Sequence, residues 1–121
     1  MDILTAARQL QVAPDQLRQW ERQGLVPPIT RQATGLRDYS AHDLAWLRHV
    51  KQLVDLGVQP DFLVEYVKLV QLGPLATPAR QALVAETKQR LTSRCQRLGQ
   101  VFDTMEAMVV RWQRGTKSDE H

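Results

Sequence analysis

The sequence predicts a mostly α-helical protein made of a small head over residues 1–73, a long helix over 77–114 and a disordered tail over 115–121. Three observations predict this organisation. Glycine and proline divide the head into four short helical segments and one short hairpin. The stretch after Pro78 contains no further proline and no glycine before Gly99. Apolar residues in that stretch recur at alternating spacings of three and four, as in a coiled coil.

Two short helices are predicted at the start of the chain. The first spans residues 3–10, where apolar side chains gather on one face. The second begins at Pro14, because the missing amide hydrogen of proline does no harm at the first position of a helix. It ends near Gly24, since glycine readily adopts the left-handed conformation that terminates a helix. The residues expected to face inward here are Leu17, Trp20 and Leu25.

A hairpin and two further helices complete the predicted head. Residues 29–39 read as a short hairpin in which Gly35 can take the positive φ of the turn. A Ser-x-x-Asp capping box opens a third helix over about 40–56. A fourth helix over 60–72 is terminated by Gly73 and the proline after it. The residues expected on the inner faces are Leu44, Leu47, Val50, Lys51, Val54, Phe62, Val64, Val67 and Val70.

The long helix carries a heptad repeat of apolar residues. From residue 91 onward the alternation of three and four continues without a miss, which is typical of a coiled coil. A helix over 78–114 would be about 55 Å long, and the small head cannot cover it. We therefore expect a second copy of the chain to cover this face; the alternative is packing on the chain's own core. The predicted dimerisation residues are Leu91, Cys95, Leu98, Phe102, Met105, Val109 and Trp112.

Composition narrows the class of protein. No run reaches the roughly 18 apolar residues of a membrane helix, and the N-terminus lacks a signal-peptide pattern. We therefore expect a cytoplasmic protein with no membrane partner.

The sequence shows no sign of an active site. The histidines form no catalytic constellation with serine or cysteine, and there is no glycine-rich phosphate loop. We expect neither an enzyme nor a cofactor. The net charge of +3 permits nucleic-acid binding but does not by itself indicate it.

The single cysteine, Cys95, admits three interpretations. Its place in the heptad favours inert packing, because an apolar setting raises the pKa of a thiol and lowers its reactivity. A thiol switch is the second interpretation. A metal site is the third, although it would need further ligands and no cluster of cysteine and histidine is present. We expect no metal, and no intrachain disulfide can form.

Four motifs in the head follow one another in an order known from one protein family. Residues 12–21 read V-A-P-D-Q-L-R-Q-W-E, residues 24–27 read G-L-V-P, residues 35–39 read G-L-R-D-Y and residues 40–44 read S-A-H-D-L. They resemble the motifs V-S-x-x-T-L-R-Y-Y-E, G-L-L-x-P, G-Y-R-x-Y and S-x-x-D-L of the MerR family of bacterial transcription regulators. The resemblance covers residues 3–72 closely and the final helix in layout.

This resemblance implies a winged helix-turn-helix DNA-binding head with a small β-hairpin wing, followed by a coiled-coil helix for dimerisation. The chain departs from the family pattern at three places. Gln11 stands where a turn glycine is usual, Gln19 and Trp20 replace a pair of tyrosines, and Leu36 replaces a tyrosine of the wing. These departures leave the base preference and the detail of the wing open.

The predicted second helix would read DNA, because in a helix-turn-helix this element lies in the major groove. Glutamine can bond to adenine, and arginine to guanine or phosphate; an ordinary solvated polar face is the alternative. The resemblance implies that Arg18 contacts the DNA backbone and that a wing arginine binds phosphate. Tyr39 is more typical of packing, although its hydroxyl could also reach the DNA. The candidate DNA-binding residues are Asp15, Gln16, Arg18, Gln19, Arg22, Arg31, Arg37 and Tyr39.

The resemblance implies a sequence-specific transcription regulator. It would bind palindromic promoter DNA as a homodimer, distort the spacer between the two promoter elements and so act indirectly on RNA polymerase. The alternative is a structural, chromosome-organising protein with the same head and coiled coil. A protein–protein adaptor that no longer binds DNA is a third possibility. The operator, the direction of regulation and any effector cannot be read from the sequence.

Overall fold

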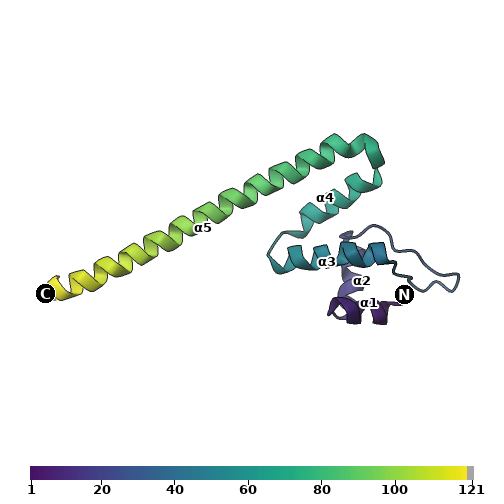
Figure 1. The fold of residues 1–121 in the computed structure, drawn as a ribbon, viewed down its shortest axis with the longest axis horizontal. Helices are drawn as coiled ribbons and strands as arrows, with labels where there is room; N and C mark the ends of the chain where they lie inside the picture. The colour runs from purple at the N-terminus through teal and green to yellow at the C-terminus, as the bar shows by residue number, and fades with distance from the viewer. Residues whose placement is uncertain (120–121) are drawn as a thin grey trace. The chain divides into compact units, whose positions relative to one another are not determined.

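The computed structural model describes residues 1–119 and contains five α-helices and one 3₁₀ turn within that range. The chain divides into two compact units, residues 1–81 and the remainder of the last helix from residue 82. Figure 1 labels the α-helices in order along the chain. The elements are α1 (Ile3–Leu10), α2 (Pro14–Gln23), α3 (Ala41–Asp55), α4 (Pro60–Gln71), the 3₁₀ turn η1 (Gly73–Ala76) and α5 (Thr77–Asp119).

The bounds of α1 and α2 agree with the sequence prediction because local capping determines them. The Asp2 carboxylate accepts a hydrogen bond from the Thr5 amide at 2.8 Å, which satisfies a donor at the start of α1. This interaction lowers the pKa of the Asp2 carboxyl group. Gly24 ends α2 with φ of 82°. Gln11, which replaces the turn glycine of the family pattern, also takes a left-handed conformation, with φ of 57°.

The third helix begins with the predicted capping box. Ser40 Oγ accepts from the Asp43 amide at 3.1 Å, and the Asp43 carboxylate accepts from the Ser40 amide at 2.9 Å. The inner face of α3 differs from the prediction at one position. Val54 is 37% exposed, and Leu53 instead packs against the core. Lys51 lies at the edge of this face as expected, and its ammonium group donates to the Leu10 carbonyl at 3.1 Å.

A single hydrophobic core holds the first unit together. Residues from α1, α2, α3 and α4 and from the segment after α2 contribute to it. Leu17, Leu25, Leu47 and Val50 are the largest of the fully buried side chains. Leu63 of α4 is 3% exposed and belongs to this core, although the sequence analysis did not place it on the inner face. Burying these apolar side chains is the main stabilising contribution to a head of this size.

The segment between α2 and α3 folds back on itself without forming regular strands. Within residues 1–119, the only β pairing is one isolated antiparallel bridge between Arg31 and Arg37. The Gln32 amide donates to the Leu36 carbonyl at 2.8 Å, and Gly35 makes the turn with φ of 86°. The predicted β-hairpin is therefore not confirmed. One bridging pair does not make a ladder, because each arm is short and an isolated two-stranded hairpin is only marginally stable in water. We keep the name wing for residues 29–39.

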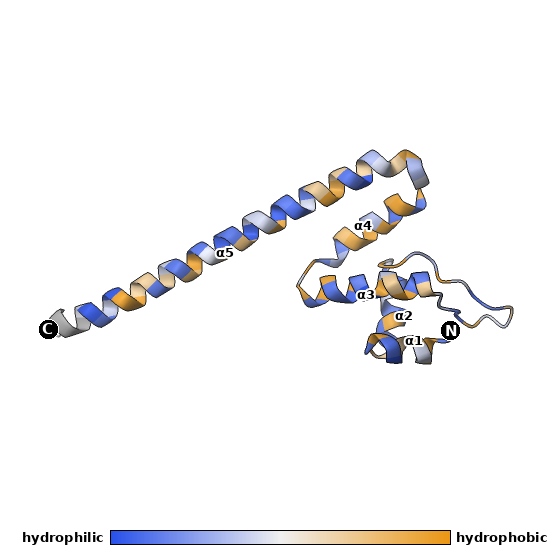
Figure 2. Ribbon diagram, viewed as in Figure 1, coloured by the Kyte–Doolittle hydropathy of each residue, from blue (hydrophilic) through white to orange (hydrophobic). Residues whose placement is uncertain are grey.

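The last helix continues beyond its predicted end. We expected α5 to stop at Gly115 and a disordered tail to follow, but the helix runs through Gly115 to Asp119. Glycine in a helix costs only about 1 kcal/mol relative to alanine, and no proline follows to force a break. Residues 120 and 121 of the predicted tail lie outside the described part of the chain. Figure 2 shows apolar segments recurring along α5 between hydrophilic ones.

Candidate DNA-binding surface

The polar face of α2 is presented to solvent because its opposite face is anchored in the core. Leu17 and Trp20 are 1% and 4% exposed and fix the rotation of the helix. Gln19 and Arg22 are exposed, and Gln16 is half-buried. The structure therefore brings the predicted α2 residues together on one side of the helix. In a helix-turn-helix protein, the first residues of the second helix are those that contact base edges in the major groove.

Asp15 and Arg18 form an ion pair at the start of this face. Arg18 Nη1 donates to Asp15 Oδ1 at 2.6 Å, and the Asp15 side chain is 92% exposed. Exposed pairs of this kind contribute little to stability because water and salt screen them. Arg18 is therefore held close to the helix N-terminus by an ion pair that is weak enough to exchange. A DNA phosphate could replace the carboxylate.

The wing is tied to α2 by a carboxylate that the sequence analysis did not single out. Arg37 Nε donates to Glu21 Oε1 at 2.5 Å, and Arg31 Nη2 lies 3.9 Å from the same oxygen. Arg31 also donates to the Gly35 carbonyl at 3.1 Å, which closes the tip of the wing. Arg31 is 48% exposed and Arg37 only 20%. The signal for Glu21 in the sequence is its place in the L-R-x-x-E motif.

Tyr39 lies in the core and not on the surface. It is 2% exposed, and its hydroxyl has no hydrogen-bond partner among the described residues. Burial raises the pKa of the phenol, while the Arg37 guanidinium nearby acts in the opposite direction. This position matches the packing interpretation of Tyr39. A contact with DNA would require the hydroxyl to become accessible.

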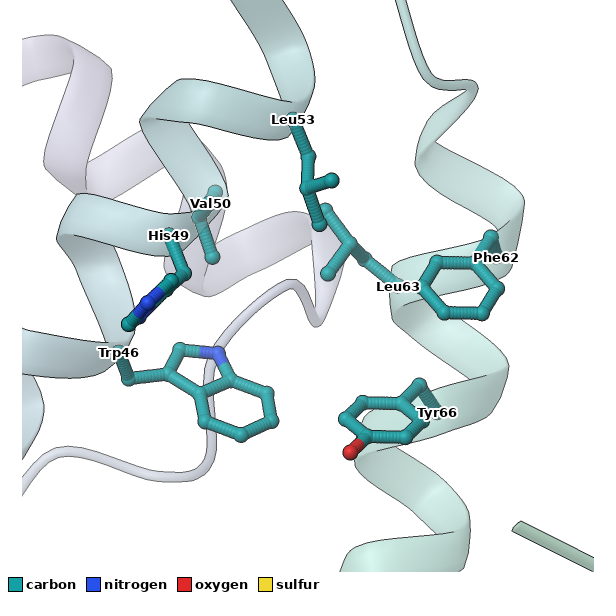
Figure 3. A pocket seen from close by; sticks show the side chains of 7 residues that line it. All are labelled: Trp46, His49, Val50, Leu53, Phe62, Leu63 and Tyr66. Atoms are coloured by element: carbon teal, nitrogen blue, oxygen red, sulfur yellow. The ribbon is translucent and has the colours of Figure 1, made fainter. Parts of the chain in front are cut away.

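A small aromatic pocket lies between α3 and α4. It has a volume of about 250 Å³ and is lined by Trp46, His49, Val50, Leu53, Phe62, Leu63 and Tyr66. Figure 3 shows the side chains of the two helices facing one another across it. The rings of Trp46 and Tyr66 stack with centroids 5.7 Å apart, and the indole of Trp46 donates to the Leu25 carbonyl at 2.9 Å. This bond fixes the orientation of the Trp46 indole.

The predicted dimerisation face of α5 is exposed in the single chain. Phe102 is 67% exposed and Trp112 is 61% exposed. Cys95 is exposed as well, and Leu91 is half-buried. Side chains of this size seldom remain together in water on a monomeric protein. The remaining residues of the face are exposed too, namely Leu98, Met105 and Val109.

No helix within residues 1–119 has the length and apolar character needed to cross a membrane. In the same range, no group of three or more histidine, cysteine, aspartate or glutamate side chains is arranged to hold a metal ion.

The head therefore has the fold of a helix-turn-helix regulator, with a solvated polar face on α2 and an arginine-bearing wing beside it. Residues 1–68 match the model of the MerR HTH family regulatory proteins. The chain belongs to this family.

Two curated relatives support the assignment. The chain is 35% identical over 91 residues to the HTH-type transcriptional regulator AdhR of Bacillus subtilis. This match covers 75% of the chain and spans 65% of the length of AdhR, slightly less than two thirds. The chain is also 29% identical over 119 residues to an uncharacterised HTH-type transcriptional regulator of Pseudomonas aeruginosa, with 98% of the chain and 90% of the relative covered. Both relatives are HTH-type transcriptional regulators.

Solved structures have the same fold. A MerR family transcriptional regulator of Listeria monocytogenes is 26% identical, with a TM-score of 0.79 over 98% of this chain and 86% of that one. HiNmlR, a MerR family regulator lacking the sensor domain and solved bound to promoter DNA, is 20% identical, with a TM-score of 0.74 over 96% of this chain and 92% of that one. At this identity the second match shows the fold alone.

Proposed function

We propose that this protein is a sequence-specific transcription regulator that binds palindromic promoter DNA as a homodimer. The observation that carries the proposal is the arrangement of the head, in which an exposed polar helix and a wing with two arginines are fixed on one core. Membership of the MerR HTH family supports it, as does the promoter DNA bound to the structurally similar HiNmlR.

The head would divide the reading of DNA between its two elements. Gln16 and Gln19 of α2 reach base edges in the major groove, where glutamine pairs with adenine. Arg18 and Arg22 contact phosphates or guanine. Contacts to phosphate fix the register on the duplex and make the affinity dependent on salt, but they do not select a sequence. On the wing, Arg31 and Arg37 supply this second kind of contact.

A second copy of the chain would cover the apolar face of α5. Two such helices paired antiparallel through residues 78–114 would each bury the seam from Leu91 to Trp112 that is exposed in one chain. A closed twofold dimer presents two identical heads. Two heads related in this way match a palindromic operator, because each half-site meets the same surface.

The mechanism of regulation that we propose is distortion of the promoter. A dimer bound over the spacer would bend and untwist it, realign the two promoter elements and so influence RNA polymerase indirectly. Bending a site in this way costs on the order of 1–6 kcal/mol, which the additional protein contacts offset. Such a protein would act in the cytoplasm, where bacterial promoters lie.

Mapping the chromosomal sites of the protein by immunoprecipitation and sequencing tests this function. We expect one or a few palindromic sites between promoter elements. Deleting base pairs from the spacer of such a promoter should change its dependence on the protein, because the distortion matters only at one spacing. Many dispersed sites would favour the chromosome-organising alternative, and no sites at all would favour an adaptor. A promoter response that does not depend on spacer length would contradict the distortion mechanism.

A further inference from the structure

The carboxylate of Glu21 lies where the recognition helix meets the wing. Its Oε1 atom accepts from Arg37 Nε at 2.5 Å and is 3.9 Å from Arg31 Nη2. Glu21 is 17% exposed and Arg37 is 20% exposed. The pair is thus largely shielded from the water that weakens exposed ion pairs. One carboxylate therefore connects α2 to both arginines of the wing.

Arg37 is held through its Nε atom, and this decides how its guanidinium group is oriented. A guanidinium carries five N–H donors in a rigid plane, and the bond from Nε to Glu21 uses only one of them. That bond fixes the plane of the group and directs Nε toward the protein. The opposite edge carries the two terminal nitrogens, which are the atoms that bind a phosphate through paired hydrogen bonds. Holding the plane in advance also reduces the side-chain entropy that is lost on binding.

We propose that Glu21 is a positioning residue for DNA binding, which holds the Arg37 guanidinium and the wing in the geometry that accepts a DNA phosphate. This inference rests on the proposed function. The carboxylate has two effects of opposite sign, because its charge is repelled by DNA while its hydrogen bond preorganises the arginine. The sign of the change in affinity on removing it therefore reveals which effect is larger.

The decisive measurement is the binding of Glu21→Ala to a fluorescein-labelled duplex of mixed sequence, followed by anisotropy over a series of salt concentrations. Phosphate contacts carry non-specific binding, so no operator is needed. We expect the affinity to fall by about tenfold, the effect of losing one charged hydrogen bond. We also expect the salt slope to become shallower by about one unit. An unchanged or higher affinity would overturn the proposal.

Two matched comparisons sharpen this test. Glu65→Ala removes the same side chain from an exposed position of α4, and we expect at most a small rise in affinity from the lost negative charge. Arg37→Ala alone should weaken binding about as much as Glu21→Ala. The double variant should then bind no more weakly than either single variant, because the carboxylate acts through the arginine. Losses that simply add would contradict the coupling.

A measurement on the free protein separates this inference from the proposed function. If Glu21 holds the wing, the amides of Gln32, Gly35 and Asp38, which donate within the wing, should exchange their hydrogens faster in Glu21→Ala. Unchanged exchange would overturn the positioning role. Failure of the unaltered protein to bind DNA would contradict the proposed function and the DNA-binding part of this inference, whereas faster exchange in Glu21→Ala would still show that Glu21 holds the wing. Circular dichroism checks folding, and Glu21→Gln, which keeps a carbonyl acceptor, should retain more protection and more affinity than Glu21→Ala.

Discussion

Tyr39 is a large polar residue that the head buries almost completely. It is 2% exposed, and its hydroxyl has no hydrogen-bond partner among the described residues. Leaving a buried polar group unsatisfied costs roughly 1–3 kcal/mol. The ring therefore contributes to the core while the hydroxyl opposes folding. The same burial raises the pKa of the phenol above the ordinary value of 10.0.

We predict that Tyr39→Phe raises the free energy of unfolding by about 1 kcal/mol, since it removes the unsatisfied hydroxyl and keeps the ring. Urea denaturation measures this change. Tyr66→Phe is the matched control, because that ring is only partly buried.

The raised pKa of Tyr39 also makes the stability depend on pH. The folded protein holds the phenolic proton more tightly than the unfolded chain does, so the free energy of unfolding is unaffected below pH 10 and falls as the pH rises through the raised pKa. The unaltered protein should thus lose stability more steeply above pH 10 than Tyr39→Phe does. A lower stability of Tyr39→Phe would indicate a partner for the hydroxyl.

The two DNA-facing elements carry different kinds of residue. The exposed face of α2 combines glutamines with arginines, whereas the charged candidate residues of the wing are the two arginines Arg31 and Arg37. Base reading and phosphate binding depend differently on salt, because only phosphate contacts release counterions. The division of labour between α2 and the wing can therefore be measured.

We predict that Arg31→Ala weakens binding to all sequences to a similar degree and makes the salt slope shallower by about one unit. Gln19→Ala should instead change the ranking of operator variants and leave the salt slope close to that of the unaltered protein. Titrations of a small set of duplexes that differ at single positions, repeated over several salt concentrations, distinguish the two outcomes. If Arg31→Ala altered the sequence preference with no change in slope, the role proposed for the wing would be wrong.

At the scale of the whole molecule, the exposed face of α5 decides the oligomeric state. An unpaired charge inside an apolar seam costs several kcal/mol as an order of magnitude. We predict that Phe102→Asp converts a dimer into a monomer near the chain mass of 13.9 kDa, as measured by light scattering at micromolar concentration. Gln100→Asp adds the same charge outside the predicted seam, and we expect it to leave the dimer intact. A monomeric unaltered protein would contradict the proposed coiled coil.

The ends of α1 and α2 follow from the sequence because the signals that set them are local. The proline that opens α2 and the glycine that closes it act within a turn of the residues they affect, and the structure has them where the sequence predicts. The capping box of α3 is confirmed for the same reason. The predicted end of α5 at Gly115 was wrong, because glycine only weakens a helix and does not by itself end one.

The tertiary structure alone decided which side chains meet across the head. Leu63 enters the core and Leu53 packs against it, whereas Val54 is exposed, since the rotation of each helix depends on the helices packed against it. The meeting of Glu21 with Arg37 joins residues 16 positions apart on two elements, and no spacing rule predicts such a contact. The sequence by itself determined the five helices apart from the end of α5, the caps of α1 to α3 and the polar face of α2. Packing determined how the wing is held against that face, because ion pairs and burial depend on distances that only the folded chain defines.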